Sequence, residues 1–143
     1  MAIARIQALR VVAASPEDVF GFLSDFGNHW ELTGRWVEAV ALEDSHGSVR
    51  IHGPLGLRRT ARTTVVDATP NQVIHGTAEV PCGTLARIAW DLDPDPAGTV
   101  VRLAAEIERT AAADRMLLAL GGRAWMTRRF DAILERLDAQ FER

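Results

Sequence analysis

The nucleophilic side chains of this 143-residue sequence lie in settings that do not favour covalent catalysis. The four serines, at positions 15, 24, 45 and 48, lack the G-x-S-x-G surroundings of a catalytic serine. The one cysteine, Cys82, lies in a Pro-Cys-Gly turn with no histidine at motif spacing, and we interpret it as a structural thiol. The chain has no lysine, which excludes Schiff-base chemistry. The sequence therefore holds no nucleophile motif.

Two of the four histidines have a spacing that invites a metal interpretation. His46 and His52 flank a predicted hairpin close to Asp44. Their parity along the strand and the missing third ligand oppose a metal site, because structural and catalytic zinc sites need at least three protein ligands. We expect no metal and no cofactor.

The other two histidines are candidates for acid–base chemistry. His29 follows Asn28 and precedes Trp30 at a predicted helix end, where a surface position is expected. His75 alternates with Ile74 and Gly76 in a predicted strand. It either faces solvent, which the pattern favours, or faces inward as a candidate general base.

Two arginines are candidates for contact with a ligand. Arg123 falls near the middle of the apolar stripe of the last predicted helix. Burying a bare guanidinium is costly, so Arg123 either extends to solvent at the mouth of a cavity or pairs with an acidic or oxygenated ligand. Arg59 is a second candidate if Ala61, Thr63 and Val65 of its strand face inward.

These residues must be positioned by a long C-terminal helix, predicted over residues 112–141. Its apolar face comprises Met116, Ala119, Met126, Phe130, Ile133, Leu134, Leu137 and Phe141. Its polar face comprises Arg128, Asp131, Glu135, Arg136 and Asp138. Gly121 and Gly122 interrupt the helix, because each costs about 1 kcal/mol of helix propensity relative to alanine.

The rest of the chain is predicted to be mainly strand. A first strand covers about residues 3–13, and Ser15-Pro16-Glu17-Asp18 then starts a helix with a capping serine and a proline at its first position. A short second helical turn is predicted over residues 28–33. Further strands are predicted at about 35–42, 47–53, 57–67, 72–80, 84–92 and 99–109. Their short connections indicate an antiparallel meander, and we expect one α+β domain over residues 1–143.

The inward positions of the middle strands are small, which predicts a cavity under the helix. They are Ala61, Thr63, Gly76, Ala78, Ala86 and Ala105. Apolar walls would come from Trp36, Ile88, Trp90, Leu103, Met126 and Phe130. Small-molecule sites of this kind measure about 300–1,000 Å³. Alternatively, the large side chains interdigitate and close the core.

Three stretches carry a resemblance to a known family. Residues 12–26, VAASPEDVFGFLSDF, are close to a V-x-A-x-P-E-x-V-[WF]-x-x-L-x-D-F opening. Gly98-Thr99-Val100-Val101 is similar to a turn into the last strand, and the final helix ends in Arg128-Arg129-Phe130 and Leu134-x-x-Leu137. The chain thus resembles the START-like, helix-grip superfamily (SRPBCC), in its polyketide cyclase/dehydrase and lipid-transport branch. It departs from the family pattern in that Trp30 is followed by Glu31 rather than proline, with Trp36 further along.

The resemblance implies a seven-stranded curved antiparallel sheet, two short N-terminal helices and a long C-terminal helix over a cavity. It also implies binding or transport of a hydrophobic small molecule, a lipid or a polyketide-like compound. The alternative is an aromatase-type polyketide cyclase or dehydrase acting on a chain held in that cavity. The expected ligand-binding residues are Trp36, Arg59, Ala61, Thr63, His75, Ile88, Trp90, Leu103, Arg123, Met126 and Phe130.

Composition restricts the partners. A net charge of −3 argues against nucleic acid, and no run of like charges suggests a polyanion or an anionic membrane as partner. No apolar run reaches the length of a membrane span, so no integral membrane association is expected. Leu117, Leu118 and Trp125 lie off the helix stripe, where they form an exposed apolar patch, a homodimer contact or packing on the sheet rim. The single cysteine and the alternating, arginine-interrupted N-terminus predict a cytoplasmic protein.

Overall fold

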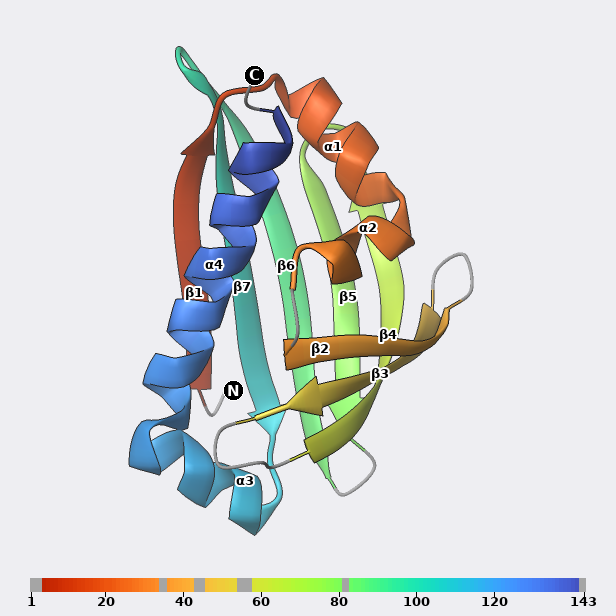
Figure 1. The fold of residues 1–143 in the computed structure, drawn as a ribbon, viewed down its shortest axis with the longest axis vertical. Coiled ribbons are helices and arrows are strands. Elements are labelled where there is room, and N and C mark those ends of the chain that lie inside the picture. The colour runs from red at the N-terminus through yellow and green to blue at the C-terminus, as the bar shows by residue number, and fades with distance from the viewer. Residues whose placement is uncertain (1–3, 34–35, 43–45, 54–57, 81–82, 142–143) are drawn as a thin grey trace.

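Seven antiparallel strands form one curved sheet in the computed structural model, which describes residues 4–33, 36–42, 46–53, 58–80 and 83–141 (Figure 1). The strands are β1 (Ala4–Val12), β2 (Val37–Leu42), β3 (His46–His52), β4 (Arg58–Thr69), β5 (Val73–Val80), β6 (Thr84–Asp95) and β7 (Gly98–Arg109). Their order across the sheet is β1-β7-β6-β5-β4-β3-β2, so only β1 leaves the meander to pair with β7. The predicted meander is confirmed, with strand ends within three residues of those expected.

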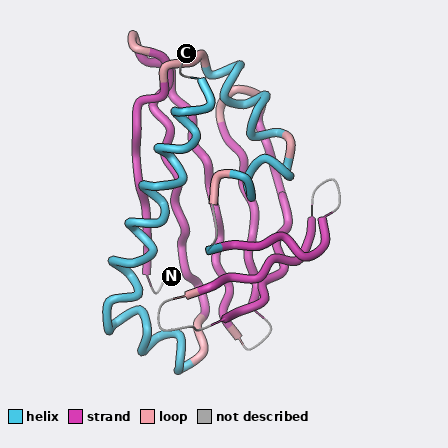
Figure 2. Tube along the Cα trace, in the orientation of Figure 1, coloured by secondary structure: helices cyan, strands magenta, loops and turns pink. Residues whose placement is uncertain are grey.

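The helices lie together on one face of this sheet (Figures 1 and 2). α1 (Pro16–Ser24) and α2 (Phe26–Glu31) connect β1 to β2. The Ser15 side chain accepts a hydrogen bond from the backbone N–H of Asp18 at 3.1 Å, which confirms the predicted cap. No helix among the described residues is long and apolar enough to cross a membrane.

The predicted long C-terminal helix is confirmed over residues 112–141, and it consists of three segments. α3 (Ala112–Leu117) leads into a π-helical turn, η3 (Leu118–Gly122), and then into α4 (Arg123–Phe141). Gly121 has φ 108°, a conformation that side chains disfavour, so the glycine pair breaks the helix as predicted. The break also ends the apolar stripe. Met116 and Ala119, expected from the sequence to face the core, are exposed.

The core lies between α4 and the inner face of the sheet. The alternation predicted for the last two strands is confirmed by their register, which pairs Trp90 with Leu103 and Ile88 with Ala105. On β1 the buried face, which the sequence did not settle, is that of Ile6, Ala8 and Val12. From α4 the residues Phe130, Ile133, Leu134 and Leu137 are buried against this face, as expected.

Asp138 is predicted by the sequence to lie on the polar face of the helix, and this is wrong. It is 8% exposed, and its carboxylate accepts hydrogen bonds from Arg10 Nε at 3.0 Å and from the backbone N–H of Ala13 at 3.3 Å. α4 packs along β1, so the buried side of the helix is wider near its C-terminus than the apolar stripe alone indicates. The carboxylate is tolerated because both of its oxygens have partners.

Candidate functional site

A pocket of about 60 Å³ lies between α2 and the inner face of the sheet. It is lined by His29, Trp30, Thr63, Thr64, Val65, Ile74, Gly76, Thr77, Ile88 and Trp90, from α2 and from β4, β5 and β6. The volume is that of about two water molecules. It is far smaller than the sequence predicts because His29 and Trp30 reach into the space that the small strand residues leave.

Gly76 forms part of the pocket for a backbone reason. The β4 to β5 register shifts between Val65 and Asp67, next to the pairing of Val65 with Gly76. A Cβ at position 76 would lie 2.6 Å from the backbone oxygen of Thr64. Glycine is therefore required here, and the pocket floor is bare backbone.

His29 is the titratable side chain of the pocket, and its predicted surface position is wrong. Its Nε2 donates a hydrogen bond to the carbonyl of Leu23 at 2.6 Å, and its ring packs edge-on against Trp90 with centroids 5.6 Å apart. Burial lowers the pKa of the imidazole below its ordinary value of 6.5, against the opposing effects of the Leu23 carbonyl and of Asp25. The lowered pKa therefore favours the neutral form of the imidazole.

One signal in the sequence could have located His29. It lies three residues before Leu32, which is fully buried, so both fall on the same side of a helical turn. The sequence pattern did not reveal this relation, because α2 has only six residues, among them the polar Asn28 and Glu31, and is too short to define an apolar stripe.

Several predicted lining residues converge on the inner face. Thr63, Ile88 and Trp90 line the pocket itself. Ala61, Leu103 and Phe130 are buried in the adjoining core, and Met126 packs against that core while half-buried. Trp36 is 8% exposed and packs edge-on against Trp125, with centroids 5.6 Å apart. Among the described residues the Trp36 Nε1–H has no hydrogen-bond partner.

His75 lies on the opposite face of the sheet from the pocket, because its neighbours Ile74 and Gly76 point inward. Its side chain is half-exposed, with Nδ1 4.0 Å from a carboxylate oxygen of Asp67. It borders an open groove of about 940 Å³ that runs from the start of α1 to the ends of β5 and β6. The lining of this groove is a mixture of polar and apolar residues, and the His75 side chain faces away from the interior pocket.

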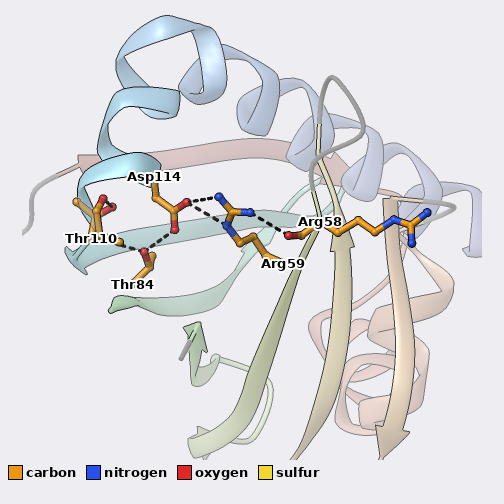
Figure 3. Close-up of polar contacts among 6 residues, drawn as sticks. Arg58, Arg59, Thr84, Thr110 and Asp114 are labelled. Carbon is orange, nitrogen blue, oxygen red and sulfur yellow. Dashed lines mark hydrogen bonds and ion pairs between the residues drawn. The ribbon is translucent and has the colours of Figure 1, made fainter. Parts of the chain in front are cut away.

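Arg59 has the predicted inward parity, with Ala61 and Thr63 buried beyond it, but its guanidinium binds a protein carboxylate (Figure 3). Its Nε and Nη2 each lie 3.2 Å from Oδ1 of Asp114 on α3. The other oxygen, Oδ2, accepts a hydrogen bond from Thr84 at 2.7 Å. This cluster ties α3 to the ends of β4 and β6.

Arg123 extends to solvent, in agreement with the first of its two expected roles. It is exposed, and its Nη2 donates to the backbone carbonyl of Arg5 at 3.1 Å, on the edge strand β1. His52 was considered together with His46 as a metal ligand. Its Nε2 lies 3.5 Å from the Oε2 carboxylate oxygen of Glu38. Asp44 and Cys82 lie outside the described residues.

The inner face is more fully buried at one end than at the other. Near α1, the inward residues Ile74, Trp90 and Leu92 are buried. Toward α3, the inward residues Ala78, Val80, Ala86 and Ile88 are only half-buried, although they belong to central strands. The three expected patch residues are also half-buried here, and Leu118 and Trp125 pack against the core. The sheet thus offers a partly uncovered apolar lining that continues from the pocket.

Comparisons with known proteins agree with this architecture. The family model described as "Polyketide cyclase / dehydrase and lipid transport" matches residues 4–142. A protein from Thermus thermophilus is 20% identical, with 95% of each chain covered and a TM-score of 0.68. The Zhui aromatase/cyclase of a Streptomyces strain is 19% identical, with 97% of this chain and 96% of that chain covered and a TM-score of 0.66. A protein from Chromobacterium violaceum is 16% identical, with 94% and 95% covered and a TM-score of 0.66. The comparison with curated protein sequences finds no match.

Proposed function

Because the chain belongs to the polyketide cyclase/dehydrase and lipid transport family, we propose that it binds a small hydrophobic molecule, a lipid or a polyketide-like compound, against the inner face of its sheet. Family membership by itself suggests either hydrophobic ligand binding or polyketide cyclase activity. The observation that supports binding is the half-buried apolar lining of β5 and β6, which continues from a pocket holding one neutral imidazole.

The pocket alone accepts only the end of a ligand, since it measures about 60 Å³. The remainder of the molecule would lie along Ala78, Ala86 and Ile88 toward α3. Burial of apolar surface would supply about 25 cal/mol per Å², less the cost of association. The His29 imidazole and the Trp36 indole N–H would orient polar atoms of the ligand, because a buried donor gains from meeting an acceptor.

The test fills the open half of the lining. Ala86→Phe places a ring on the inner face, and we expect it to weaken binding of the apolar fluorescent probe 1-anilinonaphthalene-8-sulfonate about tenfold or more, the scale on which displaced ligand contacts are felt. Ala89→Phe is the matched control, since residue 89 has the opposite parity on the same strand and faces outward. Equal probe binding by both variants, or no probe binding by the unaltered protein, would contradict the proposal.

The second candidate is a cyclase or dehydrase, and the placement of His29 favours it. A neutral imidazole beside a small apolar pocket can accept a proton from carbon next to a carbonyl group. Turnover of a model poly-β-ketone would then fall in His29→Gln and persist in His75→Gln, which alters the outer face. Turnover that survives His29→Gln, Arg59→Ala and Arg123→Ala would remove all three residues from the mechanism.

The compartment we propose is the cytoplasm. The support is the single cysteine, which cannot form an internal disulfide and so fits a reducing compartment. Fractionation of cells that express the full chain would test this.

A further inference from the structure

The segment formed by α3 and η3, residues 112–122, is a helical stretch that packs little against the rest of the chain; we call it the distal segment. None of its residues is fully buried. Met116 and Leu120, four positions apart, expose 63% and 77% of their surface, whereas Leu118 between them packs against the core. Figure 1 shows the segment at the end of the molecule, beyond the ends of the central strands. Two large apolar side chains are thus presented to the surroundings from one end.

The charge around these side chains is positive, in contrast to the chain as a whole. Residues 112–130 contain one acidic residue, Asp114, in a chain whose net charge is −3. The arginines of this stretch are all exposed: Arg115, Arg123, Arg128 and Arg129. The carboxylate of Asp114 is held by Arg59 and Thr84, and this ion pair offsets its charge (Figure 3). The stretch that carries Met116 and Leu120 therefore has an excess of exposed positive charge.

We propose that the distal segment docks the protein reversibly onto an anionic lipid surface. Met116 and Leu120 enter the boundary between headgroups and acyl chains, and the arginines contact the lipid phosphates. A second copy of the chain fits this face less well, because a symmetric contact would bring two sets of arginines together. Two inserted side chains and a few arginines make a weak attachment, which suits reversible docking.

This docking goes beyond ligand binding and has a consequence for it. The half-buried lining at Val80 and Ala86 ends beside Thr84, which binds Asp114 of the distal segment. A docked molecule would therefore turn the open end of its inner face toward the lipid.

Co-sedimentation with vesicles tests the proposal. The full chain is mixed with vesicles of phosphatidylcholine alone or of phosphatidylcholine with phosphatidylglycerol. We expect binding to the anionic vesicles, weakened by high salt. The double variant Met116→Ser/Leu120→Ser should bind at least about tenfold more weakly, because it removes the apolar side chains that would be buried in the lipid. Arg115→Gln/Arg128→Gln should bind the anionic vesicles about tenfold or more weakly, because it removes two positive charges that attract anionic lipid.

The matched control is Leu9→Ser/Val66→Ser. These residues are also apolar and exposed, at 53% and 66%, but they lie on β1 and β4 away from the distal segment, and the control should bind vesicles like the unaltered protein. No binding of the unaltered chain to anionic vesicles, or equal binding by the Met116→Ser/Leu120→Ser variant, would overturn the proposal. So would a dimer in light scattering that this variant abolishes while vesicle binding is absent, which would assign the face to a second copy.

Failure of the docking is distinguishable from failure of the proposed function. Probe binding in solution, without vesicles, reports on the inner face alone. The docking variants should retain that binding, and Ala86→Phe should retain the association with anionic vesicles.

Discussion

At the scale of single residues, the Asp138 carboxylate shows how a charged group stabilises the contact between α4 and β1. Its side chain is 11% exposed, and it is bonded to Arg10 and to the backbone of Ala13, more than 120 positions away in sequence. Arg10 is 41% exposed on its side chain, so its charge can turn to water if the partner is lost. The contribution of the pair is therefore smaller than that of a fully buried ion pair.

We expect Asp138→Ala to lower the free energy of unfolding by about 1–3 kcal/mol, because it leaves a backbone N–H and a partly buried guanidinium without their acceptor. Urea denaturation measures the change. Glu135→Ala, at an exposed position of the same helix, should change it by less than about 0.5 kcal/mol. Equal effects of the two substitutions would show that the Arg10 pair contributes nothing.

The lowered pKa of His29 makes stability depend on pH. The unfolded chain takes up a proton near pH 6.5, whereas the folded chain resists protonation until a lower pH, because burial disfavours the charged imidazole. Between these two values the unfolded state binds more protons, so the free energy of unfolding rises with pH. The contribution is complete above pH 6.5 and is lost as the pH falls toward the lowered pKa.

In His29→Gln this pH dependence should become shallower below pH 6.5. The slope due to one group does not exceed about 1.4 kcal/mol per pH unit. Urea denaturation at a series of pH values measures it, with His75→Gln on the exposed outer face as the control. An unchanged slope in His29→Gln would mean that the imidazole titrates alike in the folded and unfolded states.

At the scale of elements, the break between α3 and α4 determines which side chains reach the core. Leu120 has φ −96° and ψ 28°, and Gly121 has φ 108°, so the helix axis does not continue through η3. A continuous helix would have placed Met116 and Ala119 on the buried side. The break instead leaves them exposed and lets Asp114 reach Arg59 and Thr84.

Gly121→Ala should lower the free energy of unfolding by about 1–2 kcal/mol, because an L side chain is strained at this φ. An added Cβ meets nothing within 4 Å, so the effect would report backbone strain alone. Gly21→Ala is the control: its Cβ is also unobstructed, it lies inside α1, and it should stabilise by about 0.5–1 kcal/mol. Stabilisation by Gly121→Ala would show that the helix straightens through η3.

At the scale of the whole molecule, the sheet and helices form a fold whose inner face is only half covered. α4 packs mainly against β1, at one edge of the sheet, while α1 and α2 cover the central strands near one end. The half-buried part of β5 and β6 lies toward the end at which Thr84 binds Asp114 of the distal segment. This unequal coverage is the basis of both proposals, since it leaves an apolar lining and an apolar, cationic end on the same side of the molecule.

The sequence by itself determined the order and type of the elements, the meander and the inner face of β6 and β7, because these depend on local periodicity, turn residues and the Ser15 cap. It also determined the position of the helix break at Gly121. Only the tertiary structure decided that His29 is half-buried in the pocket and Asp138 buried, that Arg59 binds Asp114, and that the pocket is small. The physical reason is range: a six-residue helix has no periodicity to orient it, and the partners of Arg59 and Asp138 come from distant elements that meet only when the helices pack on the sheet.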